Sequence, residues 1–117
     1  MGKAKSALES QRRMGKLVKE VVEGVTGEFP LLEVYVFGSR ARGNYLDTSD
    51  LDLALVLEKL DAPKMELLEK ISKHVKGPVD IVILSSEEAA GSRLIRDAKK
   101  VWDSKEGFDL SIFQTES

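Results

Sequence analysis

VFGSRARGNYLDTSDLDLALVL, residues 36–57, joins two apolar segments through a polar turn and opens the second segment with two aspartates. These aspartates, Asp50 and Asp52, are two positions apart, so in a strand their side chains point to the same face. Aspartate is a poor strand former, and a carboxylate removed from water is costly unless it is paired or bound to a cation. The pattern therefore favours a functional role for the two carboxylates.

A third carboxylate, Asp80, opens the later apolar segment VDIVIL. If the two segments form neighbouring strands, three carboxylates converge near one sheet edge. Because the chain has no cysteine and one histidine, any metal would be held mainly by oxygen, which points to magnesium or manganese. Three carboxylates would suit one or two Mg²⁺ ions. Alternatively, Asp50 is a turn residue and Asp80 a strand end facing water. Asp52 is harder to explain in this way, because it lies inside the apolar run.

The turn between the two segments has the residues of an anion site. A strand that ends in Gly38 and Ser39 and enters a helical turn directs backbone N–H groups outward, where they bind phosphate. Arg40 and Arg42 add charge that suits a polyphosphate. The turn is neither a Walker A loop nor a Rossmann fingerprint. The alternative is a tight turn with a serine N-cap and two solvated arginines.

The remaining pattern predicts an α/β (α+β) fold, in which helices flank a small mixed sheet of three to four strands. Residues 99–104, KKVWDS, fit either a continuing helix or a short edge strand. The expected elements are a helix over 6–26 with a capping box at Ser6–Glu9, strands over 32–38, 51–58 and 79–84, a helical turn at 39–42, a loop at 43–50, a helix starting near Asp61 and Pro63, and a helix from a capping box at Ser85 to about Ala98.

Length and composition limit the possibilities further. The chain has 117 residues, which suits a single domain over 1–117 with its core at about 17–103. The net charge of -2 argues against a nucleic-acid binder that relies on its overall field. No apolar run approaches a membrane span and the N-terminus lacks a signal-peptide core, so we expect a cytoplasmic protein without membrane contact. The tail over 104–117 is rich in apolar residues, and it either packs back or docks on a partner.

These residues resemble those of the minimal nucleotidyltransferase branch of the polymerase β-type nucleotidyltransferase superfamily, whose motif is G-S-x₁₀-D-x-D. The match runs through FGSRARGNYLDTSDLDLAL and includes the GSRARG block. It covers roughly residues 17–103 without a departure at the motif positions. The helical extension before it and the tail after it lie outside the resemblance.

The resemblance implies a mechanism and assigns residues to it. ATP, as substrate, would place its β- and γ-phosphates on Gly38 and Ser39, and Asp50 and Asp52 would hold Mg²⁺. Asp80 would share one ion and is also a candidate for the proton acceptor. AMP would pass to a hydroxyl group as pyrophosphate leaves. Arg40 and Arg42 would either hold the phosphates or face the acceptor, and the sequence does not choose between them.

The resemblance also suggests a partner. Members of the minimal branch commonly pair with a small helical HEPN protein, which implies an antitoxin that adenylylates a tyrosine of a HEPN toxin. A homo-oligomer or hetero-oligomer is compatible with this role. Two alternatives stay open: a binding module that neutralises its partner by contact through Phe108–Phe113, or nucleotidyl transfer to RNA ends or to a small hydroxylated compound.

Overall fold

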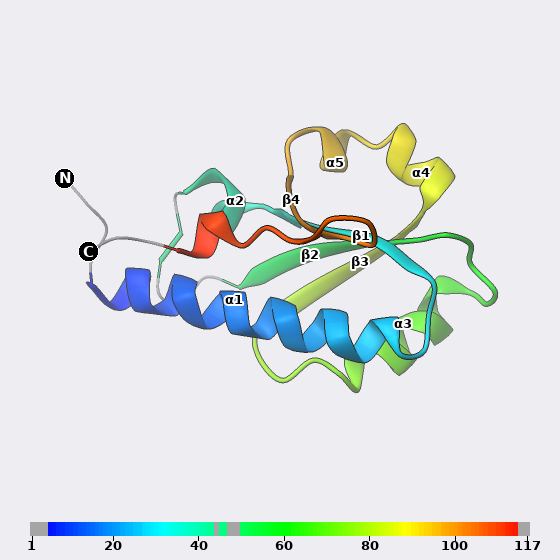
Figure 1. Ribbon diagram of the computed structural model, residues 1–117, viewed down its shortest axis with the longest axis horizontal. Helices are drawn as coiled ribbons and strands as arrows, with labels where there is room; N and C mark the ends of the chain where they lie inside the picture. The colour runs from blue at the N-terminus through cyan, green and yellow to red at the C-terminus, as the bar shows by residue number, and fades with distance from the viewer. Residues whose placement is uncertain (1–4, 44, 47–49, 115–117) are drawn as a thin grey trace.

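A computed structural model of the chain describes residues 5–43, 45–46 and 50–114. Its elements alternate along the chain as the sequence pattern predicts, with helices between strands (Figure 1). In order they are α1 (Lys5–Thr26), β1 (Leu31–Phe37), α2 (Ser39–Arg42), β2 (Leu51–Leu57), α3 (Lys64–Ser72), β3 (Val79–Ser85), α4 (Ser86–Ala90), α5 (Arg93–Arg96), β4 (Lys99–Asp103), β5 (Gly107–Phe108) and the 3₁₀ helix η1 (Ser111–Phe113).

The strands form one mixed sheet in the order β3-β2-β1-β4-β5. β2 and β3 are parallel, and the helix α3 makes the crossover that a parallel pair needs. The other neighbouring pairs are antiparallel. β2 and β3 therefore begin at the same edge of the sheet, and β1 ends there beside them.

The side chains of β2 divide between the two faces of the sheet. Leu51, Leu53, Leu55 and Leu57 are buried and belong to the main core cluster, together with the apolar stripe of α1 and Ile71 of α3. α1 and α3 thus cover one face, whereas α4 and α5 lie on the other (Figure 1). The alternate position Asp52 points to the α4/α5 face, because successive strand side chains point to opposite faces.

The sequence-based elements are confirmed with four corrections. The sheet has five strands rather than three to four, because KKVWDS forms β4 and the tail adds β5. β4 is internal rather than an edge strand. Ser6 lies inside α1 and is not its cap. The predicted loop over 43–50 falls partly on residues 44 and 47–49, which lie outside the described residues.

The fourth correction concerns the helix predicted from Ser85 to about Ala98. The capping box is present, since the Ser85 hydroxyl accepts from the Glu88 N–H and the Glu88 carboxylate accepts from the Ser85 N–H. The helix nevertheless ends at Ala90, and a new short helix begins after Ser92, whose hydroxyl accepts from the Leu94 N–H. Gly91, a weak helix former, and a serine that caps better than it propagates explain the break.

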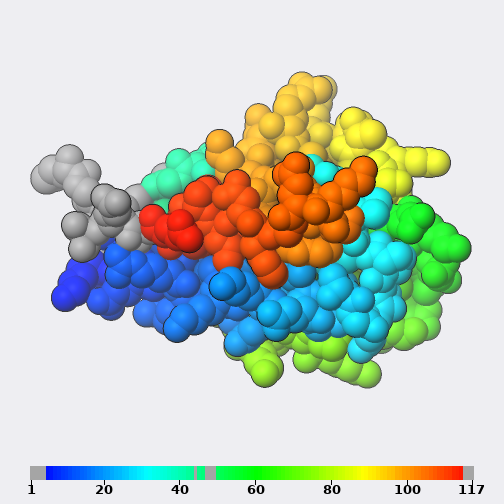
Figure 2. Space-filling model, viewed as in Figure 1, coloured from blue at the N-terminus to red at the C-terminus, as the bar shows by residue number. Residues whose placement is uncertain are grey.

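The apolar tail packs back on its own chain. Phe113 is 3% exposed in the core, and Leu110 and Ile112 pack against that core. Figure 2 shows this C-terminal segment lying on the surface of α1. Gly15 of α1 makes room for it, because an added Cβ there would lie 3.1 Å from the Phe113 Cβ. Only Phe108 remains among the exposed large apolar side chains of the tail residues described, at 40%. Across the described residues, no helix has both the length and the apolar character needed to cross a bilayer.

Candidate active site

The structure places Asp52 and Asp80 opposite each other on neighbouring strands. They are register partners in the parallel pair β2–β3. Burial, then the charges of Asp80 and Asp50, raise the pKa of the Asp52 carboxyl above its usual range. The side-chain interaction with Asp80 acts in the same direction. The two carboxylates therefore repel each other when both are ionised.

Gly38 lies directly against this pair. It follows β1, whose last residue, Phe37, is the register partner of Asp52. Its backbone has φ 73° and ψ -153°, a region that is essentially restricted to glycine. A Cβ at this position would overlap the carboxylate oxygen Oδ2 of Asp52. Glycine is therefore required here both for the backbone conformation and for the close approach of the turn to the carboxylate.

Asp50 has a different position from the other two carboxylates. It is exposed and immediately precedes β2, which begins at Leu51. It acts on Asp52 through its charge, as the third cause of the raised Asp52 pKa. In residues 5–43, 45–46 and 50–114, no group of three or more His, Cys, Asp or Glu side chains gathers closely enough to hold a metal ion. The arrangement is therefore a close pair, Asp52 and Asp80, with Asp50 at longer range.

The donor chemistry of this pair fits a divalent cation. Mg²⁺ takes oxygen ligands and is often held by one or two carboxylates while it keeps several waters. The charge of Asp80 raises the pKa of Asp52, and a cation bound between two such carboxylates relieves their repulsion. The pair Asp52 and Asp80, with Asp50 nearby, would therefore be the residues that hold Mg²⁺.

The two arginines of the turn point to different environments. Arg40 is 1% exposed and extends toward α1, where its guanidinium donates to the Gln11 Oε1 at 3.1 Å and the Ser10 Oγ at 2.9 Å. Its Cζ also lies 5.0 Å from the ring centroid of Tyr45. Arg42, by contrast, is exposed, and its charge acts on Asp52 in the direction that lowers the pKa. Arg42 therefore lies at the candidate site, whereas Arg40 is part of the buried core.

Gln11 completes the connection between the turn and the tail. Its amide nitrogen donates to the Arg40 carbonyl at 3.3 Å and to the Ile112 carbonyl at 3.2 Å. Through Arg40 and Gln11, α2 is fixed to α1 and to η1, which contains Ile112. This network positions the turn that carries Gly38 and Ser39.

We expect Arg40→Met to lower the free energy of unfolding by about 2 kcal/mol, because it leaves buried hydroxyl and amide groups without their charged donor. For a domain of this size that corresponds to a fall in melting temperature of about 10 °C. The exposed Arg42→Met should stay within about 0.5 kcal/mol of the parent protein. Thermal unfolding of the two variants checks this, and equal melting temperatures would contradict the structural role of Arg40.

A pocket of about 590 Å³ adjoins the turn on the side of α5. It is lined by Phe37, Gly38, Arg42, Arg93, Leu94 and Asp97. The last three were missed in the sequence, since their segment reads as part of one continuous helix with no motif. Only the helix break at Gly91 and Ser92 brings them to the end of β1. The two arginines make the pocket suitable for an anion.

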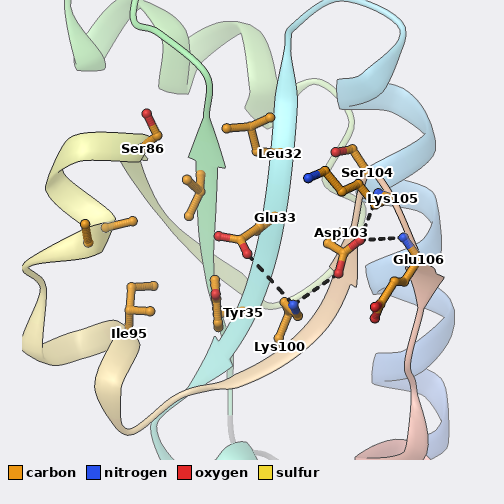
Figure 3. Close-up of a pocket in the computed structure, with 13 residues that line it drawn as sticks. Leu32, Glu33, Tyr35, Ser86, Ile95, Lys100, Asp103, Ser104, Lys105 and Glu106 are labelled. Carbon is orange, nitrogen blue, oxygen red and sulfur yellow. Dashed lines mark hydrogen bonds and ion pairs between the residues drawn. The ribbon is translucent and has the colours of Figure 1, made fainter.

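A second, larger cavity of about 730 Å³ lies at the other end of the same sheet face, between β1, β4 and the helix α4 (Figure 3). Three of its charged groups pair with one another: the Lys100 Nζ lies 3.1 Å from the Asp103 Oδ2 and 3.9 Å from the Glu33 Oε2. The Asp103 Oδ1 accepts from the backbone N–H groups of Lys105 and Glu106. Burial, followed by the Glu33 charge, raises the pKa of the Tyr35 phenol. Neither Gly38 nor the carboxylate pair lines this cavity, so we do not place the chemistry there.

Comparison with known proteins places this geometry in a family. Residues 19–107 match the polymerase beta nucleotidyltransferase family, and the chain belongs to it. The protein is thus a nucleotidyltransferase, and the predicted resemblance is confirmed at this level.

Individual relatives agree with this assignment. A candidate nucleotidyltransferase from Sulfolobus solfataricus has a crystal structure with a TM-score of 0.82 to this chain, at 45% identity over 94% of this chain and 98% of that one. The protein adenylyltransferase MntA of Shewanella oneidensis is 26% identical over 100 residues, which are 82% of this chain and 72% of the relative. A toxin–antitoxin structure with AMP-PNP shares the fold, with a TM-score of 0.51 at 21% identity, over 81% of this chain and 78% of that one.

Proposed function

We propose that this chain is a single-domain, cytoplasmic, Mg²⁺-dependent nucleotidyltransferase that transfers AMP from ATP to a hydroxyl group of a partner protein. The observation that carries the proposal is the Asp52–Asp80 pair lying against the Gly38 turn. A similar protein of Shewanella oneidensis is a protein adenylyltransferase, which supports both the nucleotide and the class of acceptor. The AMP-PNP in a structure of the same fold is compatible with ATP as the substrate.

Each residue of the candidate site would have its own role in the reaction. Gly38 and Ser39 bring backbone N–H groups and a hydroxyl to the β- and γ-phosphates. Asp52 and Asp80, with Asp50, would hold Mg²⁺, which neutralises charge that develops on the phosphates and acidifies the acceptor hydroxyl. Arg42, exposed beside Asp52, would pair with the phosphates rather than with the acceptor.

The reaction is an in-line displacement at the α-phosphorus. The acceptor oxygen forms a bond to this phosphorus, and the bond from it to the bridging oxygen of the β-phosphate breaks. Pyrophosphate leaves with the electron pair of that bond. The acceptor proton passes to Asp80, which is the more exposed carboxylate of the pair.

We further propose that the acceptor is a tyrosine of a small helical HEPN toxin, so that the chain acts as the antitoxin of the pair in a hetero-oligomer. The support is the GSRARG and D-x-D motif of the minimal branch and the likeness to MntA. The structure gives less support to the hypothesis that the tail neutralises a partner by contact, because Phe113 is buried against α1 rather than presented to a partner.

The test is label transfer from ATP in an extract of the source cells. Label on the α-phosphate should pass to a macromolecule in the presence of Mg²⁺, whereas label on the γ-phosphate should not. The product should resist ribonuclease and be degraded by protease, and its mass should rise by one AMP. Asp80→Asn serves as the inactive variant. Label that ribonuclease removes would replace the protein acceptor by RNA, and no α-label transfer to protein, RNA or small molecules would overturn the proposal.

A further inference from the structure

We propose that Arg93 is a phosphate-binding residue of this enzyme, which together with Arg42 holds the β- and γ-phosphates of the nucleotide and the departing pyrophosphate. The inference rests on the proposed function, and it adds a residue about fifty positions beyond the Gly38–Ser39 turn. Arg93 and Arg42 line the same pocket, which also includes Gly38 at the end of β1. Two positively charged side chains, one from α2 and one from α5, therefore lie beside the turn that is expected to bind the phosphates.

Arg42 shows that the pocket lies near the carboxylate pair. Its charge reaches Asp52, since it is one of the groups that act on the Asp52 pKa. An anion held by Arg42 in this pocket is therefore close to the carboxylate pair. Arginine suits this task because its planar guanidinium binds phosphate oxygens through two parallel N–H groups.

Arg93 reaches the pocket through the break between α4 and α5. The Ser92 hydroxyl caps α5 by accepting from the Leu94 N–H at 3.2 Å, which fixes the orientation of the short helix. Arg93 is exposed, and within the described part of the chain neither it nor Arg42 forms an ion pair. Both guanidinium groups are thus available to an anionic ligand. Neighbouring Leu94 and Phe37 supply apolar walls, which strengthen such contacts by reducing access of water.

A substitution of Asp97 should have the opposite effect on anion binding to a substitution of Arg93. It lines the same pocket and carries a negative charge that opposes an incoming anion. If the pocket takes phosphates, removing this charge should strengthen binding, whereas removing the Arg93 charge should weaken it. A pocket without an anionic ligand would respond to neither change.

The experiment measures binding of inorganic pyrophosphate to the full chain by calorimetry, with Mg²⁺ at a fixed concentration. We expect Arg93→Gln to weaken binding by about tenfold, the effect of losing one charge-assisted contact. Arg96→Gln is the matched control, because Arg96 is an exposed arginine of the same four-residue helix that does not line the pocket. It should bind pyrophosphate as the parent does, and Asp97→Asn should bind about two- to fivefold more tightly. Equal weakening by Arg93→Gln and Arg96→Gln, or no weakening by either, would overturn the inference.

A second measurement separates this inference from the proposed function. With α-labelled ATP, Arg93→Gln should raise the KM for ATP by about tenfold while transfer at saturating ATP falls less. If the parent protein transfers AMP and Arg93→Gln does so with an unchanged KM, the inference fails and the proposed function stands. If the parent protein binds pyrophosphate through Arg93 but transfers no nucleotide, the proposed function fails and the inference stands.

Discussion

Asp52→Asn should abolish AMP transfer and at the same time make the protein more stable. We expect the transfer rate to fall by at least about a hundred- to a thousandfold, because the variant loses a carboxylate that holds Mg²⁺ in the proposed mechanism. The melting temperature should rise by about 2–6 °C, since like charges opposite each other on neighbouring strands destabilise by up to about 1 kcal/mol. Loss of activity with a gain in stability is expected where repelling carboxylates serve the reaction and lower the stability of the fold.

The sign of the pH dependence follows from the raised pKa of Asp52. In the folded protein this carboxyl binds its proton more tightly than in the unfolded chain, because of burial and the charges of Asp80 and Asp50. The stability that the protonated form contributes is present below the unfolded pKa of about 4 and is lost as pH rises through the higher folded value. The difference in melting temperature between Asp52→Asn and the parent should therefore be small near pH 3.5 and widen toward pH 7.

Added Mg²⁺ and a distant carboxylate provide the controls. Mg²⁺ should raise the melting temperature of the parent at pH 7 more than that of Asp52→Asn, since a ligand that binds only the folded state stabilises it. Asp61→Asn changes an exposed carboxylate outside the site, so it should alter neither activity nor the pH dependence. A parent protein that is more stable than Asp52→Asn at pH 7 without Mg²⁺ would show that the two carboxylates do not repel each other.

The sequence allowed the prediction of those features that depend on local patterns. The alternation around Asp52 predicted a strand with one polar position on the face opposite the leucines, and the structure shows this arrangement. The position of Asp80 at the head of a later strand predicted a neighbour of Asp52, and the parallel register places the two opposite each other. Period-two patterning carries this information because one residue of slip would bury the carboxylate in the α1 core.

Features that depend on tertiary contacts were not predictable from the sequence. Arg40 and Arg42 are alike in a sequence, and only the position of Gln11 on α1 decides that Arg40 enters the core. The tail could equally have been an interface segment, until the space above Gly15 showed where Phe113 packs. Arg93 reaches the site through a helix break whose consequence depends on the direction in which α5 continues. In each case a contact between residues far apart in sequence overrides the local pattern.

Gly38→Ala is the second change for which we expect a large effect, on both stability and activity. Two separate penalties act at this position. A Cβ at φ 73° and ψ -153° has a backbone strain of about 1–3 kcal/mol, and the same Cβ would overlap the Asp52 carboxylate, which adds about 1–3 kcal/mol of overpacking. We expect a total loss of about 2–6 kcal/mol in the free energy of unfolding, measured by urea denaturation. Transfer should be lost, because the carboxylate and the turn can no longer approach each other.

Gly43 and a double-mutant cycle separate the two penalties. Gly43→Ala also introduces a Cβ at positive φ, 84°, but nothing lies within 4 Å of it, so it should show strain alone, about 1 kcal/mol. Combining Gly38→Ala with Asp52→Ala removes the overlapping carboxylate, so the loss at Gly38 should shrink by about 1–3 kcal/mol relative to the parent background. Strictly additive effects of the two substitutions would mean that the turn does not touch Asp52. In the proposed function, Gly38 is therefore the residue that lets the phosphate-binding turn lie against the carboxylate pair.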